Sequence, residues 1–277
     1  MDKELLEIRK KIFLTAYSAS IAHIASAFSI VEILYTLYLK KILKYDSKNP
    51  TWSERDLFIL SKGHGSLALY TILCKSGFFD EEVLKTFSKP GSYLGGEPCI
   101  PKIPGVEAST GSLGHGLSIG IGMALAKKLD NKENKVYVLL GDGECQEGTI
   151  WEAVMSAAQY KLNNLVAIID NNKLQKMDTI EKVMGIKSWK DTFKSFNWEV
   201  REVDGHNINE LEEALTKPND GDKPLVIIAN TIKGKGVSIA QNNPKWHWKL
   251  PNKKELKVFM EELNINEEEI SLCKKPI

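Results

Sequence analysis

Three short apolar runs, rich in β-branched residues, constrain the fold more than any other feature of this chain. They are VYVLL at 136–140, LVAII at 165–169 and PLVIIAN at 224–230. Uninterrupted runs of this length are typical of strands that are buried on both faces, as in a parallel sheet, and not of alternating antiparallel strands. LFIL at 57–60 is a fourth, weaker candidate.

Helical patterns of apolar residues lie between these runs, at 30–43, 66–77, 117–129 and 149–161. Strands that alternate with helices predict a three-layer, doubly wound α/β fold with a mostly parallel sheet. The length of 277 residues suits one large α/β domain or two small ones. No linker-like, low-complexity or repeated segment divides the chain. We therefore expect one domain at 1–264, followed by a loose C-terminal tail at 265–277.

The charge and the cysteines argue against several classes of function. A formal net charge of +1 gives no support for binding to nucleic acid or to an anionic membrane. The four cysteines form neither a CxxC pair nor a zinc-like spacing, which favours reduced thiols in the cytoplasm. Cys145 lies in the motif GDGECQEG, but no histidine within that motif supports a role as a nucleophile.

Residues 12–31 carry no Asp, Glu, Lys or Arg and are nearly long enough to span a membrane. However, His23 and many Ser, Thr and Ala residues keep the summed hydrophobicity of this segment modest. Acidic residues near the start of the chain also do not fit the basic region of a signal peptide. We expect a helix that is buried in the core of the domain, and no membrane association.

Polar, mostly glycine-rich segments follow each expected strand. They read SKGHG at 61–65, GDGECQEG at 141–148, DNNKLQ at 170–175 and TIKGKG at 231–236, and GVEASTGSLGHG at 105–116 leads into another expected helix. In sheets of this kind, ligands bind at the carboxyl ends of the strands. One such segment could be a simple turn, but all of them on one rim indicate a binding site.

Asp142 and Asn172 are thirty positions apart, with one expected helix and one expected strand between them. Such a unit returns the chain to the same edge of the sheet, so their loops should be neighbours. A carboxylate, an amide oxygen and a backbone carbonyl from the following turn are hard ligands that suit Mg²⁺. Gly143 would let the backbone approach a phosphate closely, and the helix near Thr149 would offer free amides. The sequence predicts a metal-bridged diphosphate here, with a sharp turn alone as the alternative.

Six motifs, in the same order, resemble the N-terminal half of transketolase, from about Arg9 to about Pro251. They are AHIASAFSIVEIL, RDLFILSKGHG, GVEASTGSLGHG, GDGECQEGTIWEA, DNNKLQ and NNPKWH. The resemblance implies a thiamine diphosphate-binding fold, and an enzyme that uses thiamine diphosphate and Mg²⁺ to transfer a two-carbon ketol unit from a ketose donor to an aldose acceptor. A nucleotide-binding fold with different phosphate chemistry is the alternative.

The resemblance implies roles for residues at the diphosphate end of the cofactor. The Mg²⁺ ligands would be Asp142, Asn172 and the backbone oxygen of Leu174. Gly143 would offer its amide to the diphosphate.

Further roles at the cofactor follow from the same resemblance. Gly111 and Leu113 would approach the aminopyrimidine end of the cofactor. Glu147 and Glu152 would be buried acidic residues that link paired cofactor sites across a subunit interface, although an ordinary surface carboxylate is the simpler reading of Glu152.

The resemblance also places His23, His64 and His247 around the thiazolium ring and the substrate. There they would hydrogen-bond sugar oxygens and move protons near neutral pH. Trp248 departs from the small residue that is usual after His247. Glu97, in LGGEP at 94–98, stands where the family usually has a donor-binding histidine. Since an ionised carboxylate accepts hydrogen bonds and cannot donate them, we expect an unusual or branched sugar, or a pyruvate-like donor. A loop residue in solvent is the alternative for Glu97.

Full-length transketolases also carry a second domain, whose glutamate activates the pyrimidine ring of the cofactor. Nothing in this sequence can be assigned that role. We therefore predict one subunit of a split, cytoplasmic enzyme that is active with a C-terminal transketolase subunit in a two-fold heterotetramer. A non-catalytic thiamine diphosphate-binding scaffold is the alternative.

Overall fold

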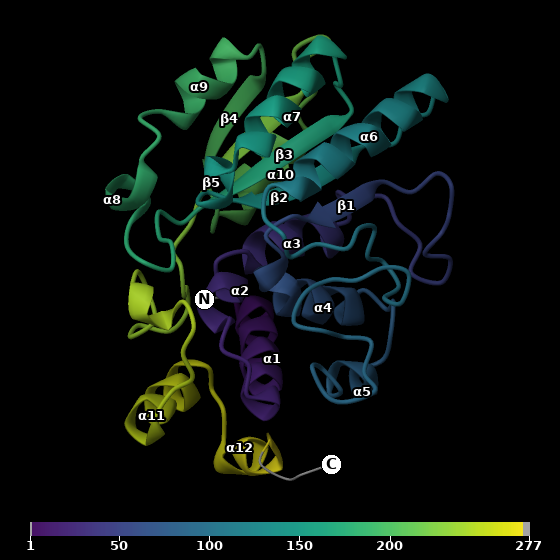
Figure 1. The fold of residues 1–277 in the computed structure, drawn as a ribbon. Helices are drawn as coiled ribbons and strands as arrows, with labels where there is room; N and C mark the ends of the chain where they lie inside the picture. Colours follow the sequence, from purple (N-terminus) through teal and green to yellow (C-terminus); the bar gives the residue numbers. More distant parts are fainter. Residues whose placement is uncertain (1, 274–277) are drawn as a thin grey trace.

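The computed structural model in Figure 1 describes residues 2–273 and contains one sheet of parallel strands. The strand order is β1-β2-β3-β5-β4. The strands are β1 (Leu57–Leu60), β2 (Val136–Gly141), β3 (Leu165–Asn171), β4 (Glu199–Asp204) and β5 (Leu225–Asn230). Every strand expected from the sequence is present, and the predicted doubly wound α/β fold is confirmed.

Helices cover both faces of this sheet, and the four helical patterns of the sequence correspond to α3, α4, α6 and α7. In chain order the helices are α1 (Lys3–Ala19), α2 (Ile24–Phe28), α3 (Val31–Tyr38), α4 (Ser66–Lys75), α5 (Glu81–Leu84), α6 (His115–Leu129), α7 (Gly148–Gln159), α8 (Ile180–Met184), α9 (Trp189–Ser195), α10 (Ile208–Thr216), α11 (Lys253–Glu262) and α12 (Glu267–Cys273). Single turns of 3₁₀ helix are η1 (Gly63–Gly65), η2 (Glu144–Gln146) and η3 (Pro244–Trp246).

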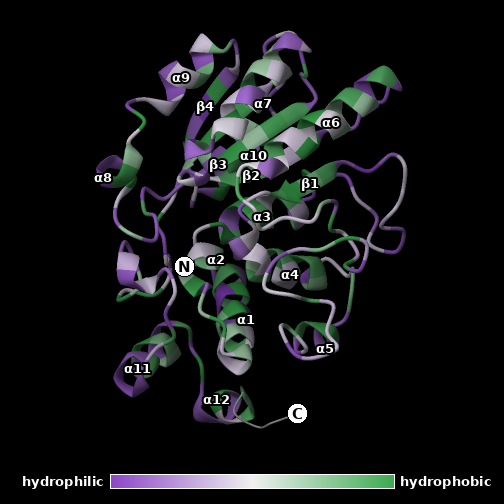
Figure 2. Cartoon of the chain, in the orientation of Figure 1, coloured by the Kyte–Doolittle hydropathy of each residue, from purple (hydrophilic) through white to green (hydrophobic). Residues whose placement is uncertain are grey.

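Successive side chains of the central strands belong to two separate hydrophobic clusters. Val136 and Val138 of β2 belong to the cluster that contains residues of α6, α7 and α9. Tyr137 and Leu139 belong to the opposite cluster, with residues of α1 to α4 and α10. Figure 2 shows β2 and β3 as mainly hydrophobic and β4 as largely hydrophilic. Because both faces of the sheet are covered, the central strands carry apolar residues on both faces and do not alternate.

The sequence analysis did not predict β4. Its sequence EVREVD is mostly charged, and β4 lies at the edge of the sheet, where it pairs only with β5. An edge strand is open to solvent along one side, so it tolerates charged side chains that a central strand excludes. The charged pattern therefore resembles that of a solvated loop.

The uncharged segment 12–31 does not form one helix. α1 ends at Ala19, Ser20 adopts a left-handed backbone with φ 57°, and α2 begins only at Ile24. Both helices contribute residues to the hydrophobic core, as expected. Across residues 2–273, none of the helices combines the length and apolar character that crossing a membrane requires. The break has a further consequence, because it places His23 in front of α2.

The expected C-terminal tail contains α12. Ile265 and Ile270 are buried, and Lys10 of α1 forms an ion pair with Glu269, with 2.7 Å between Nζ and Oε1. The segment is therefore helical and in contact with α1 as far as Cys273. Residues 274–277 lie outside the described residues.

α6 packs closely against the sheet at Gly120. A Cβ atom at Gly120 would lie 2.5 Å from Cγ2 of Val138, whereas a Cβ atom at Gly122 would meet nothing within 4 Å. We expect Gly120→Ala to lower the free energy of unfolding by about 1–3 kcal/mol through overpacking. The matched control Gly122→Ala should raise it by about 0.5–1 kcal/mol, because alanine favours the helix. Urea denaturation of the full chain measures both changes, and equal effects would contradict this packing.

Candidate active site

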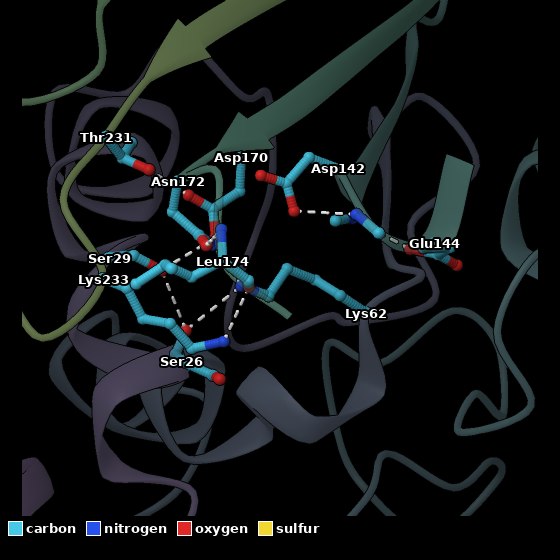
Figure 3. Close-up of polar contacts among 12 residues, drawn as sticks. Ser26, Ser29, Lys62, Asp142, Glu144, Asp170, Asn172, Leu174, Thr231 and Lys233 are labelled. Carbon is cyan, nitrogen blue, oxygen red and sulfur yellow. Dashed lines mark hydrogen bonds and ion pairs between the residues drawn. The ribbon is translucent and has the colours of Figure 1, made fainter. Parts of the chain in front are cut away.

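The ends of β2 and β3 bring the two predicted metal-binding loops together. Gly141 of β2 is paired with Asp170 of β3. Asp142 and Asn172 come after these positions and are both buried. The backbone N–H of Lys173 donates to Oδ2 of Asp142 at 2.5 Å, so the loops are in direct contact. Figure 3 shows Asp142 and Asn172 near each other at the carboxyl edge of the sheet.

The predicted ligand oxygens form a set that fits Mg²⁺. Oδ1 of Asp142 accepts one hydrogen bond, from the N–H of Gly143 at 2.7 Å, and Oδ1 of Asn172 accepts one from the N–H of Leu174 at 3.1 Å. The carbonyl oxygen of Leu174 accepts one from Nζ of Lys233 at 3.0 Å. Each of these oxygens has a second lone pair that can face a cation. Hard oxygen ligands of this kind are those that Mg²⁺ prefers.

The electrostatics of Asp142 also fit a bound cation. Burial and the neighbouring carboxylate of Asp170 raise the pKa of Asp142 to about 7, even though backbone N–H groups donate to it. A buried carboxylate is costly to ionise unless a positive charge lies beside it. A metal ion at these oxygens would provide that charge. The assignment of Asp142, Asn172 and Leu174 as metal ligands stays a prediction.

The surroundings of Gly143 fit a phosphate group. A Cβ atom on Gly143 would lie 3.0 Å from Cγ of Gln175, so a larger residue would fill this space. Nε2 of Gln175 is buried and has no hydrogen-bond partner among the described residues. Buried donors normally have a partner, and a phosphate oxygen would supply one. The nearby start of α7 offers further free amides.

Glu97 lies against the glycine loop that precedes α6. Gly111 has φ 139°, which favours glycine, and a Cβ atom there would lie 1.9 Å from Oε2 of Glu97. Glu97 is exposed in the single chain, and Leu113, further along the loop, is half-buried. The carboxylate of Glu97 therefore borders the loop that the resemblance places near the aminopyrimidine.

Glu144 ties the loops of the site together, a role that the sequence analysis missed. Its buried carboxylate accepts hydrogen bonds from Oγ of Ser61 at 2.5 Å and from the N–H groups of Gly114 and Gly141, both at 2.9 Å. Burial raises the pKa of Glu144 despite these bonds. The loop after β1 and the loop before α6 are thereby fixed to the end of β2.

The three predicted histidines form one cluster. The ring centroids of His23 and His64 are 5.7 Å apart, and that of His247 lies 5.9 Å from His23 and 6.1 Å from His64. They come from three distant segments: the start of α2, η1 and the end of η3. Trp248 contacts His23 edge to face at 4.3 Å. A catalytic role for these histidines stays a prediction.

All three imidazoles are neutral near pH 7. Burial, followed by the charge of Lys233, lowers the pKa of His23 to about 4 and that of His247 to about 3. Burial, followed by the charge of Lys62, lowers the pKa of His64 well below its ordinary value. A neutral imidazole has one N–H donor and one acceptor nitrogen. The cluster can therefore hydrogen-bond to polar oxygens without placing a positive charge on them.

Buried charges beside the histidines were also missed by the sequence analysis. Lys62 forms an ion pair with Asp170, with 2.5 Å between Nζ and Oδ2. Lys233 lies 3.0 Å from Nδ1 of His247. The available signal was a lysine beside a glycine just after a strand, in SKG and IKG, and an acidic residue at the end of the strand in DNN.

Glu147 and Glu152 do not point into this cluster. Glu147 occupies the N-cap position of α7 without a side-chain cap hydrogen bond, and both residues are exposed in the single chain. Met155, close to Glu152 on α7, is also 51% exposed. Burial of these carboxylates at a subunit interface stays a prediction.

The fold and the site together define an α/β domain with neighbouring oxygen ligands and a cluster of neutral imidazoles at the carboxyl edge of its sheet. The chain belongs to the transketolase family, because residues 8–274 match the family model described as "Transketolase, thiamine diphosphate binding domain". Thiamine diphosphate binding and membership of a transferase family are thus confirmed.

Proteins similar to this chain include separate subunits and longer enzymes. It is 41% identical over 270 residues to a protein of Phocaeicola vulgatus that is named as one subunit of apulose-4-phosphate transketolase, and the match covers 95% of each chain. It is 39% identical over 241 residues to "6-deoxy-6-sulfo-D-fructose transketolase subunit SqwG" of a Clostridium species, covering 87% of each. It is 38% identical to human transketolase over 84% of this chain but only 37% of the human protein. The crystal structure of Campylobacter jejuni transketolase matches with a TM-score of 0.86 and 31% identity, over 99% of this chain and 46% of that one.

Asp142→Asn should have opposite effects on cofactor binding and on the stability of the cofactor-free chain. We expect it to abolish Mg²⁺-dependent binding of thiamine diphosphate, because the charge that balances the metal is lost. The folded-state pKa of Asp142 is raised from 3.8 to about 7, so ionisation of Asp142 destabilises the fold increasingly as the pH rises between these values. Without Mg²⁺, Asp142→Asn should therefore stabilise the chain more at pH 8 than at pH 5. Calorimetry and urea denaturation measure the two effects, and unchanged cofactor affinity would contradict the metal assignment.

Proposed function

We propose that this chain is the diphosphate-binding subunit of a two-chain transketolase and is active only with a second chain that holds the pyrimidine end of the cofactor. The observation that carries this proposal is the likeness to a separate transketolase subunit of the same length, which extends over 95% of both chains. The matched part of human transketolase is, by contrast, 37% of that protein. A non-catalytic scaffold would have no need of three clustered, neutral imidazoles.

The chain's own residues would bind the cofactor and orient the substrate. Thiamine diphosphate, when bound, supplies the electron sink for the carbanion that forms when the C2–C3 bond of a ketose breaks. Asp142, Asn172 and the carbonyl of Leu174 would hold its diphosphate through Mg²⁺.

His23, His64 and His247 would act on the sugar. They would hydrogen-bond the carbonyl and hydroxyl oxygens of the donor and exchange protons with them. Their partial burial strengthens such hydrogen bonds, because the local dielectric constant is lower than in water.

We further propose that the outer surface of α7 contacts another subunit in the assembled enzyme. Glu152 and Met155 are exposed on this helix, and Ile119 of α6 is also exposed. Met155 is an exposed apolar side chain close to Glu152, and the family resemblance implies that Glu152 is buried between subunits. Both features favour an interface here. A heterotetramer with two copies of each chain would bring Glu147 and Glu152 of paired sites close together.

The proposed location is the cytoplasm. All four cysteines are free thiols, as expected in a reducing compartment.

Burial, followed by the charge of Glu144, raises the pKa of the Cys145 thiol well above its ordinary value. Cys145 is therefore a poor nucleophile, which agrees with the lack of a neighbouring histidine in its motif.

The proposed donor is an unusual ketose. Two similar proteins are named for apulose-4-phosphate and for 6-deoxy-6-sulfo-D-fructose. Glu97 supports a difference from ordinary transketolases, because its carboxylate borders Gly111 in the loop near the cofactor. A carboxylate at this position would accept hydrogen bonds from donor hydroxyls and repel nearby anionic groups.

The isolated chain should have no ketol-transfer activity. We expect activity with xylulose 5-phosphate or another ketose phosphate to appear when the chain is mixed with its partner, thiamine diphosphate and Mg²⁺, because the pyrimidine end of the cofactor then gains its activating residue. A coupled spectrophotometric assay measures this, with Asp142→Asn plus partner as the inactive control. Turnover by the pure chain would refute the split enzyme, and cofactor binding without turnover in the mixture would favour a scaffold.

Glu97→His should shift the donor preference towards ordinary ketose phosphates. We expect kcat/KM for xylulose 5-phosphate to rise by about tenfold in the assembled enzyme, since repulsion is removed and a hydrogen-bond donor is gained. Glu97→Gln is the matched control, because it removes the charge but keeps the size of the side chain. Identical values for the wild type and both variants would make Glu97 a solvated loop residue.

A further inference from the structure

Lys233 is a buried cation between the predicted metal loop and the histidine cluster. It follows β5, and only 2% of its surface is exposed. Its backbone is held on both sides: the N–H of Gly234 donates to the carbonyl of Ala25, and the carbonyl of Lys233 accepts from the N–H of Asn242, both at 3.0 Å. Ala25 lies in α2, two residues after His23, and Asn242 precedes η3. The position of the ammonium group is therefore set by the same segments that carry the histidines.

The contacts of this ammonium group determine a property of His247. Nζ lies 3.0 Å from the carbonyl oxygen of Leu174 and 3.0 Å from Nδ1 of His247. A lysine ammonium has donors and no acceptor, so Nδ1 of His247 must offer a lone pair. In a neutral imidazole the proton is then on Nε2.

We propose that Lys233 is a positioning residue that holds His247 as the Nε2–H tautomer. The statement that His247 meets the substrate rests on the proposed function, whereas the tautomer itself does not. The nitrogen that faces away from Lys233 is then a hydrogen-bond donor. It suits a carbonyl or hydroxyl oxygen of a sugar, but it cannot take a proton from one. Proton acceptance is thereby left to His23 or His64.

Nitrogen NMR of the full chain reads this tautomer without cofactor, partner or substrate. In long-range ¹H–¹⁵N spectra of histidine-labelled protein, the signals lost in His247→Gln assign the His247 ring. We expect a protonated Nε2 and an unprotonated, hydrogen-bonded Nδ1. Lys233→Met should shift the Nδ1 signal towards that of a protonated nitrogen, because the Nδ1–H tautomer is then no longer excluded, and Lys233→Arg, which also only donates, should keep the wild-type signal. A protonated Nδ1 in the wild type, or an unchanged Nδ1 signal in Lys233→Met, overturns the proposal.

Kinetics of the assembled enzyme separate an effect through His247 from an effect through Leu174. With xylulose 5-phosphate, Lys233→Met should lower kcat/KM by about tenfold or more, since a histidine in the wrong tautomer is a poor catalyst. In the His247→Gln background the same substitution should cost less than about twofold, because residues that act as a unit are not additive. Equal losses in both backgrounds would place the effect at the metal loop and overturn the proposal. Absence of any ketol transfer would refute the proposed function, while the spectra still decide the tautomer.

Discussion

The hydrogen bonds of the Asp170 carboxylate are the interactions on which the carboxyl edge of the sheet depends. The carboxylate is fully buried at the end of β3 and accepts hydrogen bonds from Ser29, Lys62, Asn172 and Thr231. These residues belong to the segment between α2 and α3 and to the segments that follow β1, β3 and β5. Burial alone would raise the pKa of Asp170, but the charge of Lys62 and these hydrogen bonds hold it below its ordinary value. Breaking a buried ion pair typically costs about 3–5 kcal/mol, so one side chain fixes the segments that carry the site.

Burial and the charges around Asp170 together keep the histidines neutral, and the same charges make the site suit a metal-bound anion. Lys62 and Lys233 are both buried, and near pH 7 they face Asp170 and a partly protonated Asp142. Burial, and after it the excess positive charge, opposes protonation of the imidazoles. It also favours a diphosphate, whose metal would in turn complete the ionisation of Asp142. The same cluster of charges therefore influences the protonation of both the histidines and Asp142.

The sequence predicted those features that depend on local patterns and on the return of the chain to the same edge of the sheet. The central strands were predictable because both of their faces are covered, and Asp142 and Asn172 because a βαβ unit brings their loops together. β4 was not, since a charged edge strand has the pattern of a solvated loop. Lys62 and Asp170 were not either, because buried charges look like surface charges in a sequence. The contact between these two residues, 108 positions apart, offsets much of the cost of burying their charges.

The hydrophobic core and the carboxyl edge of the sheet differ in how well their groups are satisfied within the chain. Buried residues form a hydrophobic cluster on each face of the sheet, which favours folding without a ligand. At the carboxyl edge, Asp142 has a raised pKa and Nε2 of Gln175 has no partner among the described residues. A ligand that satisfies such groups binds the native chain and not the unfolded one, so it stabilises the fold by mass action. Binding of cofactor and metal would thus stabilise the fold and prepare the site for catalysis in one step. If the groups at this edge were instead satisfied within the free chain, binding would no longer stabilise the fold in this way.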